Sequence, residues 1–107
     1  MTNKKVETLL SKIKILKQDL DQLAEMRPGS LTKQLHKRGD KEWPYWQISY
    51  TRKGRSRTEY IRDEFVDQIK NEIEEYKKFK IITNKLVELS IDLSKERIKL
   101  YKEKIKS

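Results

Sequence analysis

The chain has 107 residues, of which 35% are hydrophobic and 40% are charged, and its formal net charge is +9. A chain this short and this polar forms one domain and cannot bury a large core, so we expect a single elongated domain. It has no cysteine, which excludes disulfides and thiolate metal sites, and we predict neither a metal nor a cofactor.

The positive charge is concentrated in the middle of the chain. Residues 1–26 and 63–107 each carry a net charge of +1, whereas residues 27–62 hold ten basic and three acidic side chains, for +7. A localised basic patch is typical of nucleic-acid binding. The alternative is the solvated surface of a lysine-rich protein. We expect a nucleic-acid partner, with DNA favoured over RNA.

A heptad spacing of apolar residues predicts a helix over residues 4–26. Thr2 or Asn3 can cap its start, and Pro28 ends it because the residue before a proline avoids the α region. The seam consists of Val6, Leu9, Ile13, Leu16, Leu20 and Leu23.

Residues 31–61 are expected to form a small antiparallel sheet of two or three strands. Apolar and polar residues alternate weakly from Leu31 to Lys37, which predicts a first strand, and residues 38–42 are predicted to form a loop. The segment from Trp43 to Ile61 has the pattern of a β-hairpin that turns near Gly54.

Two registers are open to this hairpin. A two-residue turn would place Lys53 at a positive φ, which is costly for a residue with a Cβ. A three-residue loop over residues 52–54 leaves only Gly54 there, and we favour it. It places Trp46, Ile48, Tyr50, Thr58 and Tyr60 on a face that packs against a helix, and Gln47, Ser49, Thr51, Arg55, Arg57 and Glu59 on the outer face.

A second helix is predicted over residues 63–105, with Asp63 as its N-cap. A three-residue step from Tyr76 to Phe79 interrupts its heptads, which predicts a stammer. The fold class is therefore α+β, in which the two helices form an antiparallel stalk. The first helix is too short to cover residues 89–105, so we expect a homodimer through the helices, or otherwise a frayed tail.

The outer face and the turn carry side chains suited to nucleic acid, because arginine matches both phosphates and guanine edges. A two-stranded ribbon also fits the major groove of DNA. Trp43 and Tyr45 are candidates for stacking on unpaired bases. The predicted nucleic-acid-binding residues are Lys33, Lys37, Arg38, Gln47, Ser49, Thr51, Arg52, Lys53, Arg55 and Arg57.

Catalytic chemistry finds little support in the sequence. His36 is the single histidine and lies beside Lys37 and Arg38, and all three glycines occur in turn signals. We therefore predict a protein that is not an enzyme. No apolar run resembles a signal peptide or a membrane span, so we expect a soluble, cytoplasmic protein.

Three segments carry a resemblance to a known family: MRPGSLTKQ at 26–34, PYWQISYTRKGRSRTEYI at 44–61 and LVELSIDLSKER at 86–97. They resemble small proteins of unknown function that are often found beside transposase genes in bacteria and archaea. Many members have a cysteine cluster that looks like a zinc site, which this chain lacks. The resemblance implies association with mobile elements.

Two functions follow as hypotheses. The first is a non-enzymatic nucleic-acid-binding accessory or regulatory protein, most suited to double-stranded DNA, that binds through a basic β-hairpin. The alternative is a coiled-coil adaptor or inhibitor that acts on a protein such as a transposase or a nuclease.

Overall fold

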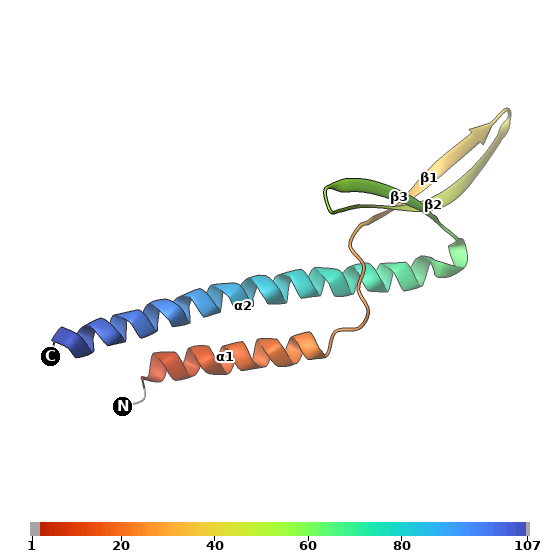
Figure 1. Ribbon diagram of the computed structural model, residues 1–107. Coiled ribbons are helices and arrows are strands. Elements are labelled where there is room, and N and C mark those ends of the chain that lie inside the picture. Colours follow the sequence, from red (N-terminus) through yellow and green to blue (C-terminus); the bar gives the residue numbers. More distant parts are fainter. Residues whose placement is uncertain (1–2, 107) are drawn as a thin grey trace. The chain divides into compact units, whose positions relative to one another are not determined.

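A computed structural model describes residues 3–106 and has an α+β fold, as predicted. The elements are α1 (Lys4–Asp21), β1 (Ser30–Arg38), β2 (Lys41–Arg52), β3 (Arg55–Ile61), a 3-10 turn η1 (Asp63–Phe65) and α2 (Val66–Lys106). The three strands form one antiparallel sheet in the order β1-β2-β3 (Figure 1). Within the described residues, no helix combines the length and the apolarity that crossing a bilayer requires.

The chain divides into two compact units. One contains α1 and the part of α2 from Phe79 onward, and the other contains residues 24–78. The division within α2 falls at the three-residue step between Tyr76 and Phe79. The seam of α2 therefore changes its packing partner where its heptad pattern is interrupted.

In the helical unit, α1 packs against α2 in the antiparallel direction. Leu9 and Ile13 of α1 form a buried cluster with Leu93, against which Val6, Leu86 and Leu89 also pack. Near the start of α1, Lys5 Nζ lies 3.3 Å from the carboxylate of Glu96, which is buried. The heptad seam of α1 therefore predicted this interface. The expectation that α1 leaves all of residues 89–105 uncovered is wrong, because Leu93 and Glu96 are buried.

The first helix begins as expected but ends five residues early. The Asn3 side chain accepts a hydrogen bond of 2.8 Å from the Lys5 amide, whereas Thr2 lies outside the described residues. The helix ends at Asp21 rather than residue 26. Beyond it, the Ala24 amide donates to the Glu75 carboxylate at 3.0 Å and the Arg27 amide donates to the Glu72 carbonyl. These contacts satisfy backbone groups that a longer helix would otherwise use.

In the sheet unit, one face of the sheet packs on the first turns of α2. Ile48 is fully buried there. The cluster consists of Ile48, Ile61, Val66, Ile69 and Ile73, with Leu31 and Trp46 packed against it. The 3-10 turn over 63–65 precedes α2, and Arg62 rather than Asp63 occupies its N-cap position, without a side-chain cap. The predicted cap at Asp63 is therefore wrong, because the chain tightens into this turn first.

The strands are longer and the turns tighter than expected. The predicted loop over 38–42 is a two-residue turn, because Arg38 pairs with Lys41. Gly39 supplies a positive φ of 63° at its first central position, where two-residue hairpin turns need one.

The predicted register of the second hairpin is wrong. Arg52 pairs with Arg55, so the turn contains only Lys53 and Gly54, with φ of 52° and 74°. This turn has the positive φ pair of type I′, whose twist matches the strands it joins. That match outweighs the cost of placing Lys53 in the left-handed region.

Candidate functional site

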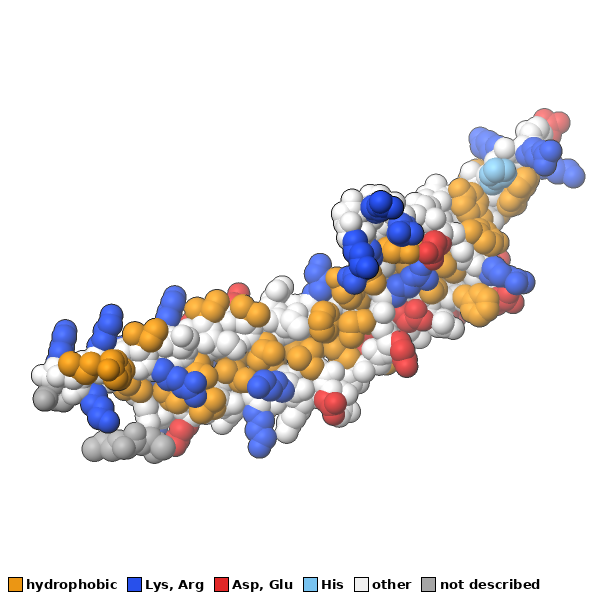
Figure 2. Space-filling view, viewed as in Figure 1, with side chains coloured by type: hydrophobic (Ala, Val, Ile, Leu, Met, Phe, Trp, Pro, Cys, Tyr) orange, Lys and Arg blue, Asp and Glu red, His pale blue; other side chains and the backbone are white. Residues whose placement is uncertain are grey.

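The tip of the β2–β3 hairpin is a cluster of unneutralised positive charge. Arg52, Lys53, Arg55 and Arg57 are all exposed and, with Tyr50, line a shallow hollow. None of the four basic side chains forms an ion pair with any residue from 3 to 106. Figure 2 shows basic side chains gathered at this hairpin. We call these four residues the cationic tip.

The corrected register divides the predicted binding face. A one-residue shift moves every β3 side chain to the other side of the sheet. Tyr50 now lies opposite Arg57, and Ser49 lies opposite Thr58. Arg55 and Arg57 therefore share a face with Ile48, beyond the part that α2 covers. The predicted partners Gln47, Ser49 and Thr51 lie on the other face, so these two sets do not form one surface.

The basic residues of β1 do not join the cationic tip either. The Lys33 ammonium lies 5.8 Å from the centre of the Trp46 ring, and Lys37 forms an ion pair with Glu42 at 3.2 Å. Arg38 pairs with Lys41 at the opposite end of β2 from the tip. These predicted site residues are therefore spread along the sheet rather than gathered.

The face of the sheet that does not pack on α2 is uncharged over most of its length. We call it the open face. Ser49 and Thr58 hydroxyls lie 3.4 Å apart across β2 and β3, and those of Thr51 and Ser56 lie 3.5 Å apart. Its strand residues are Ser30, Thr32, Gln34, His36, Arg38, Lys41, Trp43, Tyr45, Gln47, Ser49, Thr51, Ser56, Thr58 and Tyr60.

Four aromatic rings form a row across the three strands of the open face. The ring centres of His36 and Trp43 are 4.6 Å apart, those of His36 and Tyr45 are 6.1 Å apart, and those of Tyr45 and Tyr60 are 6.2 Å apart. The structure thus brings together the predicted stacking candidates, Trp43 and Tyr45, with two residues that were missed. Tyr60 was expected to pack on a helix, but it is 66% exposed.

The one acidic residue of β3 lies beside the cationic tip. Glu59 accepts a hydrogen bond of 2.7 Å from the Tyr50 hydroxyl and forms an ion pair with Arg27. The Tyr50 hydrogen bond and, next, that of Arg27 lower the pKa of the Glu59 carboxyl. The charge of Arg57 also lowers this pKa, by less than the contacts of Tyr50 and Arg27, although no ion pair joins Arg57 to Glu59.

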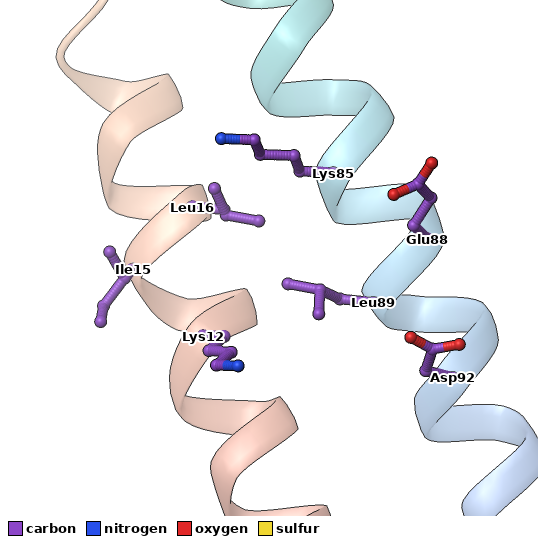
Figure 3. A pocket seen from close by; sticks show the side chains of 7 residues that line it. All are labelled: Lys12, Ile15, Leu16, Lys85, Glu88, Leu89 and Asp92. Carbon is purple, nitrogen blue, oxygen red and sulfur yellow. The ribbon is translucent and has the colours of Figure 1, made fainter.

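The helical unit has two further surface features. Figure 3 shows a hollow between α1 and α2, in which Leu16 and Leu89 project toward one another and Lys85 reaches toward α1. Its other lining residues are Lys12, Ile15, Glu88 and Asp92. The second feature is a row of exposed apolar side chains along α2: Val87, Ile91, Ile98, Tyr101 and Ile105. We call this row the α2 stripe.

The part of the chain that the structure describes contains no group of three or more His, Cys, Asp or Glu side chains arranged to hold a metal. No curated protein and no solved structure matches this chain. A family model described as a domain of unknown function, DUF6788, matches residues 6–71. The match includes α1 from Val6 onward, the whole sheet and α2 as far as Asn71. The chain therefore belongs to the DUF6788 family.

Proposed function

We propose that the protein is a non-enzymatic nucleic-acid-binding protein that holds the phosphate backbone with the cationic tip. The observation that carries this proposal is the set of four exposed basic side chains, free of ion pairs with residues 3–106, at the end of a two-stranded ribbon. Like charges held this close together destabilise a sheet. A polyanion that neutralises them removes that cost.

The chemistry of the tip suits phosphate. An arginine side chain binds a phosphate through two parallel hydrogen bonds, and lysine adds a mobile point charge. The side chains of Arg52, Arg55 and Arg57 share one face of the ribbon. They can therefore contact successive phosphates of one strand while Lys53 extends from the turn.

Salt dependence gives the first test. If the protein neutralises about six phosphates, the logarithm of its binding constant falls with the logarithm of the salt concentration at a slope near −5. We expect the Arg55→Ala/Arg57→Ala protein to bind more weakly and to lose about 1.5 from the magnitude of this slope. Fluorescence anisotropy with labelled duplex DNA, single-stranded DNA and RNA at several salt concentrations measures both quantities.

A matched control separates this site from the general charge of the protein. Lys99→Ala/Lys106→Ala removes the same charge from exposed positions on α2. It should leave the slope nearly unchanged. Equal losses in the two double variants, or no loss in either, would contradict binding at the tip.

The proposal includes a role as an accessory or regulatory protein of mobile elements, which is supported by the resemblance to proteins encoded beside transposase genes. Duplex DNA is the ligand that the ribbon's width favours. The separation of the arginines from Gln47, Ser49 and Thr51 argues for backbone contacts by the tip rather than for base readout by one mixed face.

We also propose a homodimer through the α2 stripe. The spacing from Val87 to Ile105 is that of heptad core positions, with Ser94 at the missing position. In a parallel pair, Arg97 of one copy would lie beside Lys102 of the other, which is unfavourable. In an antiparallel pair centred on Ser94, Lys102 meets Glu88 at two symmetric places, and Lys95 meets its own copy once. Charge complementarity therefore favours a second, antiparallel copy.

A further inference from the structure

We propose that the open face binds single-stranded nucleic acid by stacking bases on its row of aromatic rings. This inference rests on the nucleic-acid binding proposed above and adds a second ligand, a single strand that is held by the open face rather than by the arginines of the tip. A duplex keeps its bases stacked on one another, whereas an unpaired strand can offer the flat face of each base to a protein ring.

The exposure of the rings carries the inference. Large aromatic side chains stabilise a protein by being buried, yet Trp43 is 42% exposed and Tyr60 is 66% exposed. His36, Trp43, Tyr45 and Tyr60 come from all three strands and lie within 4.6–6.2 Å of a neighbouring ring. Neighbouring strands are about 4.8 Å apart, so the row can support more than one base.

The charge of the open face fits the same ligand. None of its strand residues is acidic, since Glu42 and Glu59 lie on the other face. Arg38 and Lys41 lie at one end of β2, and the cationic tip lies at the other. The arginines of the tip project from the face of Ile48, so the charged strand residues of the open face are Arg38 and Lys41. A strand laid on the open face would therefore meet the rings beside these two cations, with no acidic side chain among them.

The uncharged polar side chains of the open face add hydrogen bonding. Gln34 and Gln47 flank Tyr45, and both can donate to and accept from the edge of a stacked base. The hydroxyls of Ser49 and Thr58 continue this polar surface toward the tip. Such groups tolerate many base sequences, so we expect little sequence specificity.

The experiment compares a 20-nucleotide oligo(dT) with a duplex of the same length at fixed salt. The test variant is Tyr45→Leu/Tyr60→Leu, which keeps apolar bulk and removes both rings. We expect its affinity for oligo(dT) to fall at least about fivefold, the lower end for loss of one stacked base. Tyr45→Phe/Tyr60→Phe keeps the rings and should restore binding.

A control removes an exposed ring from elsewhere in the protein. Phe65 is 46% exposed in η1, outside both the open face and the α2 stripe, and Phe65→Leu keeps apolar bulk there. This variant should bind oligo(dT) as the original protein does. Far-ultraviolet circular dichroism and thermal unfolding check that the sheet remains folded in each variant.

The outcomes separate this inference from the proposed function. If the leucine double variant is folded and binds oligo(dT) normally while Arg55→Ala/Arg57→Ala does not, the rings do not stack and only the present inference fails. If the original protein binds the duplex but does not bind oligo(dT), the inference fails in the same way. If no nucleic acid binds and an acidic protein does, both proposals fail together.

Discussion

The Tyr50 hydroxyl donates a hydrogen bond of 2.7 Å to the carboxylate of Glu59, on the neighbouring strand. The guanidinium of Arg27 lies 5.4 Å from the centre of the Tyr50 ring and also pairs with Glu59. Three residues from three segments therefore connect the chain before β1 to β2 and β3. Their contacts fix both the position of Tyr50 and the negative charge nearest to the cationic tip.

The first prediction concerns the pKa of Glu59. Its hydrogen bonds lower the pKa of this carboxyl from the ordinary value of 4.5. They therefore stabilise the fold at pH values above 4.5, and this stabilisation is lost as the pH falls through the lowered pKa of the folded protein. Tyr50→Phe removes the largest cause and should raise this pKa, as measured by NMR titration of the Glu59 carboxyl. Tyr60→Phe should not change it. An unchanged pKa in Tyr50→Phe would contradict the role of the hydroxyl.

The second prediction separates stability from binding at Lys53. Its φ of 52° is unfavourable for lysine but acceptable for asparagine. We therefore expect Lys53→Asn to stabilise the protein by roughly 0.5–1 kcal/mol and, in the same variant, to weaken nucleic-acid binding by removing a cation. Thermal unfolding and salt titrations measure these opposite effects. If unfolding temperature and affinity fell together, the turn strain would be refuted.

Much of the fold could be predicted from the sequence because its signals are local. The heptad spacing in α1 identified Leu9 and Ile13, which are buried, and the alternation from Leu31 to Lys37 predicted β1. The end of α1 could not be predicted, because it depends on Glu72 and Glu75, about fifty residues later in the chain.

The candidate site was predicted less well, for a single physical reason. The cationic tip was predicted from the basic residues around the turn at Gly54, but the faces depend on whether the turn has two or three residues. Local cost at Lys53 favoured the longer loop, whereas strand twist favours the shorter one. That one-residue difference moved Arg57 away from Ser49 and placed Tyr60 beside Tyr45.

The third prediction concerns Gly29, which leads into β1. Its φ is 141°, and a Cβ built there would lie 2.9 Å from Ile48 Cγ1 and 3.0 Å from the Ser49 carbonyl oxygen. Since a backbone oxygen cannot easily move, Gly29→Ala should destabilise the protein by about 2–4 kcal/mol. Gly39→Ala is the control, because Gly39 also has a positive φ but no atom lies within 4 Å of the added Cβ. Urea unfolding should show that Gly39→Ala lowers the free energy of unfolding by only about 1–2 kcal/mol. Equal losses in Gly29→Ala and Gly39→Ala would refute the steric argument.

The fourth prediction tests the orientation of the proposed dimer. The chain has no cysteine, so single cysteines can be introduced without interference. In an antiparallel pair centred on Ser94, residue 87 of one copy lies opposite residue 101 of the other. Mixing Val87→Cys and Tyr101→Cys proteins under mild oxidation should therefore give mainly the mixed disulfide. Ser94→Cys should link to itself.

A parallel pair gives a different pattern, because each position then lies opposite its own copy. Val87→Cys would form a disulfide with itself and the mixed product would be scarce. Ile98→Glu places a charge at a heptad core position and should abolish crosslinking of Ser94→Cys, because a buried unpaired carboxylate destabilises the interface. A sedimentation profile that stays monomeric at tens of micromolar for the original protein would rule out the dimer.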